Sequence, residues 1–324
     1  MASESTEGSI EVDSQSGTQT TSWYSVDNLS LKQQEFIEGW AFVLGKLALI
    51  LFVIGFPMVF AFYLSFTNSN LVNLPGEFIG LQNYRWILNQ PVWWTSLKNV
   101  FLLAAVVIPT NIIFSFTTAL LLREKLRGST LYRIAFLIPV AGPPIIWAIV
   151  WKLVLFPNQG GIVNAVLLSL GVIQSYIPFL SDTATALPSV IISQMWGFGL
   201  SMLIYMAALA GLPASVMESA AMDGANKYQK VRYIIWPLMK PTTFFLVIIQ
   251  LVLVMRMGFG AVFVMTQGGP VNSTMVPSYL IYELAFQYNS FGQSAAAAIL
   301  IFLVTSLIAL LTYKPLQSNA EYYQ

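Results

Sequence analysis

Six long apolar stretches constrain this chain more than any other feature of its sequence. They lie at residues 40–66, 97–122, 131–156, 187–212, 242–265 and 294–313. A bilayer core needs about 20 apolar residues per helix, so each stretch is long enough to cross a membrane. Only 9% of the 324 residues are charged, against about 25% in soluble domains. The sequence therefore predicts an all-α integral membrane protein with six transmembrane helices, surrounded by lipid.

The third stretch carries three prolines, Pro139, Pro143 and Pro144. In water they would break a helix, because proline lacks the N–H that the helix requires. In a membrane, neighbouring helices can satisfy the carbonyls that proline leaves free. We therefore expect one kinked helix over residues 131–156.

The basic residues predict the orientation of the chain. They gather between the second and third stretches and between the fourth and fifth: Arg123, Lys125 and Arg127, then Lys227, Lys230, Arg232 and Lys240. The alternate loops hold a single basic residue, Arg85. Because cytoplasmic loops are enriched in Lys and Arg, we expect both basic loops and both termini in the cytoplasm.

Outside residues 40–313 the sequence predicts two tails, a cytoplasmic one over 1–39 and a C-terminal one over 314–324. Residues 1–22 are rich in Ser, Thr, Glu, Gln and Gly. Such a segment buries too little apolar surface to offset its ordering entropy, so we expect it to be disordered. It is acidic and lacks a basic start, unlike a secretory signal peptide.

The residue types exclude several kinds of chemistry. The chain has no Cys and no His, which removes thiol chemistry, Ser-His catalysis and His-ligated metals. It has no G-x-x-x-x-G-K-[ST] motif, so ATP cannot bind through a P-loop. A net charge of +1 argues against a nucleic-acid partner, which would need a basic surface. We therefore expect no enzyme activity and no cofactor or metal on this chain.

The cytoplasmic loop 213–241 carries strong helix signals. Ser215 and Glu218 have the S-x-x-E spacing of a capping box, and Gly224 stands where a left-handed helix end is needed. Asn226 can cap a second helix, which we expect to end at Pro237 and Pro241. The prediction is a helix-turn-helix on the cytoplasmic face of the membrane.

The small side chains of this loop admit two interpretations. A capped connector between two membrane helices is the simpler one. However, Ser219, Ala220, Ala221, Gly224 and Ala225 leave one face nearly bare, so another backbone can approach closely. Met217 and Met222 flank that face, and methionine suits an adaptable docking surface.

This loop resembles the docking loop of permeases of binding-protein-dependent ABC importers. The family motif has E-A-A, three residues, G, nine residues and I-x-L-P. Here Glu218-Ser219-Ala220, Gly224 and Ile234-Ile235-Trp236-Pro237 follow that spacing, with Ser219 replacing Ala and Trp236 replacing Leu. The resemblance implies that a short helix enters a groove of an ATPase subunit. The implied docking residues are Glu218, Ser219, Ala220, Ala221, Met222, Asp223, Gly224 and Ala225.

Other segments are similar to carbohydrate permeases of this family. They are Ser65-Phe66-Thr67, Gly80-Leu81-Gln82-Asn83-Tyr84, Leu126-Arg127-Gly128, and Thr266 to Pro270 with Ser273, Thr274, Tyr279, Phe286, Gly292, Ser294 and Ala295. The resemblance implies the type I importer permease fold and an extracytoplasmic binding protein that delivers a sugar or related solute. It also implies two ATPase subunits, which hold ATP and Mg, and a second related permease. A homodimer remains open.

The turn Gly268-Gly269-Pro270 has two interpretations. Both glycines permit positive φ and Pro270 fixes the exit, which favours a tight loop end. Alternatively, this outer rim contacts the binding protein.

A sugar path needs hydrogen-bonding groups and flat apolar faces. The candidates in the spans are Asn111, Gln194, Trp196, Gln250, Arg256 and Phe259. An ionisable residue inside a span is by default a functional hypothesis, so Arg256 could bind substrate, or it could cap carbonyls near Gly258. Lys46 and Lys152, near span ends, are expected to extend to the membrane surface.

A secondary transporter or channel for a polar solute is the alternative function. Such proteins place ionisable coupling residues near the midplane. The spans contain one deep arginine and no deep Asp or Glu, which favours the importer permease.

Overall fold

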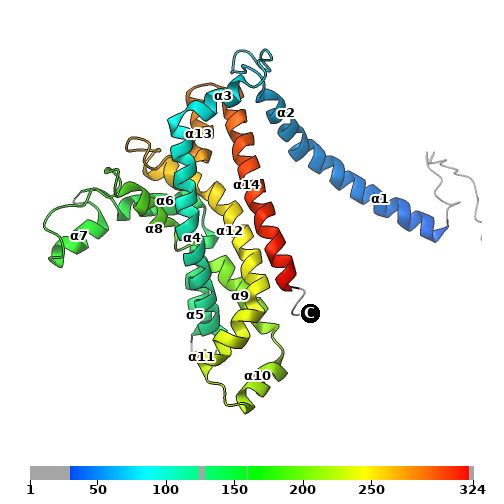
Figure 1. Cartoon of the computed structure of the whole chain (residues 1–324), viewed down its shortest axis with the longest axis vertical. Coiled ribbons are helices and arrows are strands. Elements are labelled where there is room, and N and C mark those ends of the chain that lie inside the picture. The colour runs from blue at the N-terminus through cyan, green and yellow to red at the C-terminus, as the bar shows by residue number, and fades with distance from the viewer. Residues whose placement is uncertain (1–29, 124–127, 159, 321–324) are drawn as a thin grey trace, which may run out of the picture. The chain divides into compact units, whose positions relative to one another are not determined.

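The computed structural model describes residues 30–123, 128–158 and 160–320, and these residues form helices joined by loops (Figure 1). In this described part, the only β-pairing is an isolated antiparallel bridge between Thr67 and Phe78. The predicted all-α class is therefore confirmed. The predicted disordered segment 1–22 lies outside the described residues. The chain divides into two units, Met1–Met58 and Val59–Gln324.

The first unit is built on a long apolar helix. It comprises α1 (Leu31–Ile50), the π-helical turn η2 (Leu51–Gly55) and the start of α2 (Phe56–Leu64). In the π turn the Phe56 N–H donates to the Leu51 carbonyl, directly before Pro57. A π-bulge lets a helix continue past a proline, which lacks the N–H and crowds the carbonyl four residues earlier.

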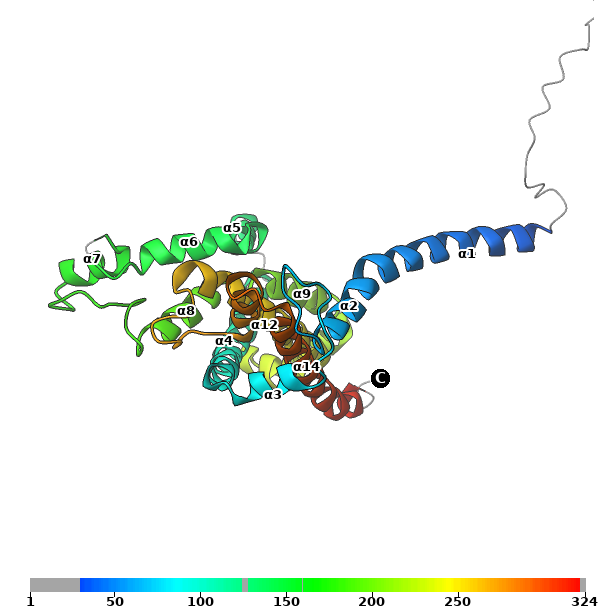
Figure 2. The same ribbon diagram turned by 90° about the horizontal axis from the view of Figure 1, so that it is seen from above.

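Helix α4 (Pro91–Arg123) is the centre of the second unit. It packs against α9 (Gly199–Ala210) and α12 (Trp236–Met265) (Figures 1 and 2). At one end of this core lie α3 (Gln82–Asn89), α13 (Pro277–Tyr282) and the π turn η4 (Glu283–Gln287). Helix α14 (Phe291–Ala320) packs against α3 and α13, and it continues past the predicted end of the last span at 313.

The third apolar stretch forms two helices rather than one kinked helix. They are α5 (Ser129–Ala141) and α6 (Pro144–Val154), which meet at an angle of 99°. Pro143, the last residue before α6, has an extended backbone with ψ 133°, as expected for a residue that precedes a proline. The described residues thus contain five helices able to cross a membrane, or six if this bent pair counts as one.

The fourth stretch is also interrupted. Helix α8 (Ala186–Gln194) ends before Gly197, and α9 begins at Gly199. A side chain at Gly199 would place its Cβ 2.1 Å from the Phe136 carbonyl oxygen of α5. Glycine therefore permits the close approach of α9 to α5. Beyond α6, the short helix α7 (Ile162–Ser169) belongs to the loop that leads to α8.

The loop before the fifth stretch contains α10 (Ala214–Met222) and α11 (Lys227–Lys230). The expected helix end at Pro237 and Pro241 is wrong. The π turn η3 (Val231–Ile235) joins α11 to α12, and the helical run continues from Lys227 to Met265. The Trp236 N–H donates to the Val231 carbonyl, so a π turn again precedes an aromatic–proline pair and absorbs the missing proline N–H.

Candidate functional site

Helix α10 begins differently from the prediction. Pro213 is the residue before the helix, with φ −59° and ψ 128°, and no side chain caps the helix start. The capping box predicted for Ser215 and Glu218 is therefore wrong. Ser215 is the second helical residue, so it has no extended backbone from which its hydroxyl could reach the third amide. Glu218 is exposed and has no hydrogen bond or ion pair to the described residues.

The end of α10 follows the prediction. Gly224 has φ +75°, the Ala225 N–H donates to the Ala220 carbonyl at 2.9 Å, and the Gly224 N–H donates to the Ala221 carbonyl at 3.1 Å. These are the two bonds of a Schellman motif. A capping box does exist one turn later, because Asn226 and Gln229 exchange side-chain to backbone hydrogen bonds of 2.8 Å.

Fewer of the predicted residues of α10 are exposed than its sequence suggested. Ala220 is buried, and Met217 packs against the core of the second unit. Met222 is 89% exposed, so the two methionines do not flank one face. Of the predicted docking residues, Glu218, Ser219, Ala221, Met222, Asp223 and Gly224 are exposed, while Ala225 is half-buried.

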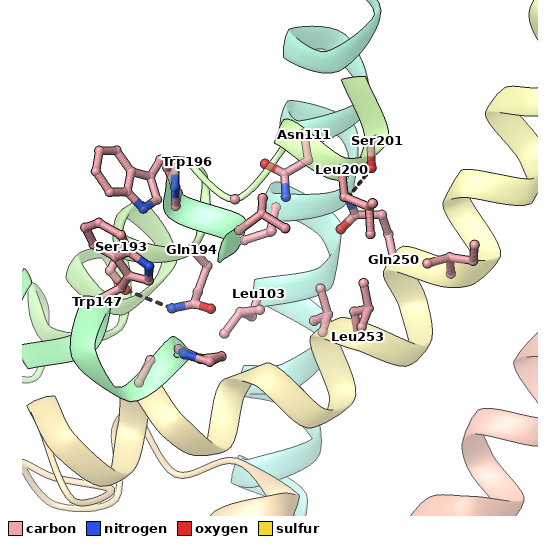
Figure 3. A pocket seen from close by; sticks show the side chains of 18 of the residues that line it. Leu103, Asn111, Trp147, Ser193, Gln194, Trp196, Leu200, Ser201, Gln250 and Leu253 are labelled. Atoms are coloured by element: carbon pink, nitrogen blue, oxygen red, sulfur yellow. Dashed lines mark hydrogen bonds between the residues drawn. The ribbon is translucent and has the colours of Figure 1, made fainter. Parts of the chain in front are cut away.

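A cavity of about 160 Å³ is lined by residues of α4, α5, α6, α8, α9 and α12 (Figure 3). It lies where the third and fourth stretches are interrupted, because Gly142 and Pro144 line it from one break and Trp196 and Gly197 from the other. Irregular backbone at membrane depth is tolerated where it is buried in protein or lines a cavity. The residues at the two helix breaks therefore form part of the cavity wall.

The structure brings four of the six predicted path residues to this cavity: Asn111, Gln194, Trp196 and Gln250. Figure 3 shows Asn111 and Gln250 on one side and Trp147 with Trp196 on the other. The Gln250 amide donates to Ser201 at 3.0 Å, and the Gln194 amide donates to Ser193 at 3.1 Å. Asn111 is 3% exposed, and its Oδ1 atom has no hydrogen-bond partner in the described residues.

Two residues of this cavity escaped the sequence analysis, Trp147 and Trp151 of α6. Their ring centroids lie 5.2 Å and 6.1 Å from that of Trp196, in edge-to-face geometry. Neither indole N–H has a partner in the described residues. The sequence offered one signal for them. The two tryptophans follow the proline cluster and are four residues apart, which places them on one helix face.

Of the other two path candidates, Phe259 does not line the cavity. Phe259 packs in an aromatic cluster with Phe263 and Tyr282, at centroid distances of 5.4 Å. Arg256 belongs to α12, but its side chain lies outside the described part of the chain, so its role stays a prediction. The Lys152 ammonium donates to the Val264 carbonyl at 2.8 Å, which corrects the prediction that it extends to the membrane surface.

The loop after α12 is a tightly bonded turn. Gln267 and Gly268 have positive φ, whereas Gly269 does not, so of the two glycines only Gly268 adopts the backbone conformation that glycine permits. The Thr274 hydroxyl donates to the Gly269 carbonyl at 2.8 Å. Asn99 of α4 donates to the carbonyls of Ser273 and Met275 at 3.0 and 2.9 Å, which ties the loop to the core.

Segments that resembled the family separately in sequence come together in space. Asn83 of α3 donates to the carbonyls of Ser65 and Thr67 at 2.9 and 2.8 Å. A Cβ on Gly292 of α14 would lie 2.0 Å from the Thr67 carbonyl oxygen. The three segments therefore form one buried polar cluster at the end of the unit that carries α3 and α13.

Comparisons with known proteins agree on one family. The family described as "Binding-protein-dependent transport system inner membrane component" matches residues 111–319. The probable ABC transporter permease protein YesP of Bacillus subtilis is 32% identical, over 81% of this chain and 87% of its own. The lactose transport system permease protein LacF of Rhizobium radiobacter is 30% identical, over 88% and 95%. A solved bacterial ABC transporter for import of the acidic polysaccharide alginate superposes with a TM-score of 0.76 at 21% identity, over 88% and 96%.

Proposed function

The chain belongs to the family of binding-protein-dependent transport system inner membrane components, the permeases of ABC importers, and we propose that it forms the membrane path for a sugar or related solute. The observation that carries the substrate proposal is the cavity at the two helix breaks. Its lining joins the amides of Asn111, Gln194 and Gln250 to the ring of Trp196. Amides bond hydroxyl groups, and indole rings cover the apolar face of a sugar.

The exposed part of α10 is our candidate for ATPase docking. The proposed docking residues are Glu218, Ser219, Ala220, Ala221, Met222, Asp223, Gly224 and Ala225, and all of them except Ala220 are proposed to contact the ATPase. Support comes from the exposure of Met222 and Glu218 and from the short side chains between them. Ala220, being buried, acts by fixing the helix against the core rather than by touching a partner.

The proposed assembly has four further components. A second, related permease completes the path, and two ATPase subunits bind ATP and Mg on the cytoplasmic side. A binding protein delivers the solute to the loop after α12 on the opposite side. The basic residues of the loop between the fourth and fifth stretches support this orientation, with both termini in the cytoplasm.

The proposed mechanism is alternating access driven by the ATPase pair. Closure of the ATPase subunits on ATP moves α10. Helix α10 is joined through the capped turn at Asn226 and the continuous run Lys227–Met265 to the cavity wall. A helix transmits such displacement along its axis, so movement at α10 shifts Gln250 relative to Asn111. Hydrolysis then returns the path to the inward-open state.

Two substitutions at Gly224 test the docking proposal. A Cβ added at Gly224 would meet no heavy atom within 4 Å beyond the two chain neighbours, so a large side chain would extend into the space assigned to the ATPase. We expect Gly224→Trp to retain ATP hydrolysis but lose solute uptake in a reconstituted importer. Gly224→Asn is the matched control, because asparagine tolerates the left-handed conformation and is small.

The assembly itself is tested by purification in mild detergent. We expect an ATPase subunit to copurify with the permease. If no ATPase subunit copurifies, or if Gly224→Trp and Gly224→Asn transport equally well, the proposed docking function is wrong.

A further inference from the structure

The start of the fifth span carries positive charge that no nearby acid in the sequence balances. No Asp or Glu occurs between residues 224 and 282, whereas this stretch begins with four basic residues: Lys227, Lys230, Arg232 and Lys240. They belong to α11, η3 and the first turns of α12, at the end of the unit that carries α10 (Figure 1). Arg232 and Lys240 are exposed, and in the described part of the chain neither forms an ion pair or a hydrogen bond. Such a surface attracts an anion from outside the chain.

The π turn η3 brings Arg232 and Lys240 onto one side of the helix. In a regular α-helix, side chains eight positions apart point in directions that differ by about 80°. A π turn contains one residue more than an α turn, so the two residues have the offset of seven α-helical residues, close to two full turns. They then lie about 10 Å apart along the helix axis. The long side chains of arginine and lysine can therefore reach one phosphate group between them.

This part of α12 lies at the depth of the lipid headgroups. The fifth apolar stretch begins two residues after Lys240, so Lys240 lies at the edge of the bilayer core and Arg232 about 10 Å outside it. On the side of α12 that carries Lys240, Phe244 and Leu251 are half-buried, and Phe245 beside them is exposed. The basic pair therefore continues an apolar surface toward the cytoplasm, and a phospholipid has the same order of acyl chain and phosphate.

Tyr233 holds the Arg232 guanidinium at this surface. The carbon of the guanidinium lies 5.8 Å from the centre of the Tyr233 ring, within the range of a cation–π contact. The tyrosine is 69% exposed, and tyrosine is enriched at membrane–water interfaces, where its ring is in the apolar layer and its hydroxyl is hydrated. Contact through the ring face leaves the N–H groups of the guanidinium available to phosphate oxygens.

We infer that Arg232 and Lys240, with Tyr233, bind the phosphate of an anionic phospholipid from the cytoplasmic leaflet. Basic pockets on the cytoplasmic side of membrane helices bind such headgroups. Two cations without an acid favour a headgroup of net negative charge, such as phosphatidylglycerol, over a zwitterionic one. The inference depends on the proposed orientation of the chain and not on its solute.

The bound phosphate would bridge the two ends of η3. This turn joins α11, which follows the docking helix α10, to α12, and α12 lines the cavity. The lipid therefore stabilises the joint between the docking helix and the cavity wall. Because ligand binding to the native state raises the melting temperature, phosphatidylglycerol should raise that of the parent protein more than phosphatidylcholine does.

Lipid binding is measured on the full-length permease, together with the subunits that copurify with it. Native mass spectrometry in mild detergent counts the phospholipids retained as dioleoyl-phosphatidylglycerol or dioleoyl-phosphatidylcholine is added. We expect the first phosphatidylglycerol to bind more tightly than phosphatidylcholine. Arg232→Gln and Lys240→Gln should each weaken phosphatidylglycerol binding about fivefold, and the double variant about 25-fold, since each basic residue near an anionic headgroup contributes about that factor.

Matched variants separate a defined site from general attraction. Lys227→Gln removes the same charge from the same loop outside the pair, so it should retain the affinity of the parent protein. Exchange of the pair, Arg232→Lys with Lys240→Arg, keeps both charges and should retain binding. Tyr233→Phe keeps the ring and should bind as the parent does, whereas Tyr233→Leu should bind about threefold more weakly.

Two further measurements identify the source of the phosphate and the folded state of the variants. Free glycerol phosphate carries the same anion without acyl chains, and at millimolar concentration it should not displace the lipid. In detergent without added lipid, each variant should melt at the temperature of the parent protein, which shows that it is folded.

The outcomes that would overturn the inference are distinct. Equal weakening by Lys227→Gln would indicate diffuse attraction rather than a site. Equal affinity for phosphatidylcholine, or displacement by glycerol phosphate, would exclude an anionic lipid as the ligand. Binding to the permease alone, but not to the permease with its ATPase subunits, would assign this face to a subunit contact. Solute uptake and ATPase copurification are separate measurements, so the proposed function stands or falls independently.

Discussion

Three buried asparagines perform the same task in different parts of the second unit. The amide nitrogens of Asn83, Asn99 and Asn164 each donate to two backbone carbonyls of an irregular segment. Carbonyls outside helices cannot stay unpaired in a membrane protein interior. Each of these asparagines is therefore a structural residue, because both N–H donors of its amide group are bonded to the backbone.

The substitution Asn99→Asp tests this role, since aspartate has nearly the same shape but lacks the amide donors. It leaves the carbonyls of Ser273 and Met275 unpaired, so we expect the free energy of unfolding to fall by roughly 2–4 kcal/mol. Thermal unfolding of the detergent-purified permease measures the loss. The neighbouring exposed residue provides the control, because Lys98→Ala should change stability little. Equal melting temperatures for the two variants would contradict the argument.

Glu283, the first residue of the π turn η4 outside the spans, gives a pH-dependent prediction at the same scale. Burial raises the pKa of this carboxyl above its ordinary value of 4.5, so the folded state favours the protonated form. Stability is therefore full below pH 4.5 and falls as the pH rises through the raised pKa. We expect Glu283→Gln to melt at a higher temperature than the parent protein at pH 8, with no difference at pH 4. A constant difference across this range would show that desolvation is not the cause.

At the scale of elements, local sequence signals predicted the end of α10 at Gly224 and the start of α11 at Asn226, but missed the start of α10 and the helix that continues past Pro237. The end of α10 was predicted because Gly224 adopts a conformation that few other residues adopt readily. Its start was not, because the S-x-x-E spacing of Ser215 and Glu218 does not specify which residue is extended, and Pro213 took that position. In the third stretch, the prolines indicate where the helix is interrupted, but they do not specify the 99° angle between α5 and α6. Helix α6 packs against α12, a contact that no local sequence signal predicts.

The missing capping box changes what is expected of Glu218. With no local partner in the described residues, its exposed carboxylate is available to a neighbouring subunit. We therefore expect Glu218→Gln to weaken retention of the ATPase subunit on a pull-down column, whereas Ser215→Ala on the same helix should retain it. Full retention by Glu218→Gln would mean that the carboxylate contributes no contact.

At the scale of the whole molecule, the membrane class followed from apolar length, whereas the sites depended on long-range contacts. Asn83 and Gly292 meet at the Thr67 carbonyl although about two hundred residues separate them along the chain. The cavity likewise combines residues of α4, α5, α6, α8, α9 and α12. Amides within spans were predictable as candidates, because polar groups in lipid are costly. The positions of Phe259, outside the cavity, and Trp147, in its lining, could not be predicted from the sequence, because they depend on how the helices pack.

The helical run Lys227–Met265, which ends with α12, connects the two proposed contact surfaces: α10 and the loop after α12. Helix α10 precedes this run, and Val271 follows its end at Met265. From Trp236 to Met265 there are 30 residues, or about 45 Å at 1.5 Å per residue, which exceeds the roughly 30 Å of a bilayer core. Met222 and Val271, 89% and 88% exposed, should therefore lie on opposite sides of the membrane.

Single-cysteine variants make this arrangement measurable, because the chain contains no native cysteine. With a membrane-impermeant maleimide on intact spheroplasts, we expect Val271→Cys to be labelled at once and Met222→Cys only after permeabilisation. The reverse pattern would invert the orientation predicted from the basic loops. Labelling of both variants from one side would show that α12 does not cross the membrane. It would then also contradict the proposal that ATPase docking at α10 is coupled to a path that opens on the opposite side.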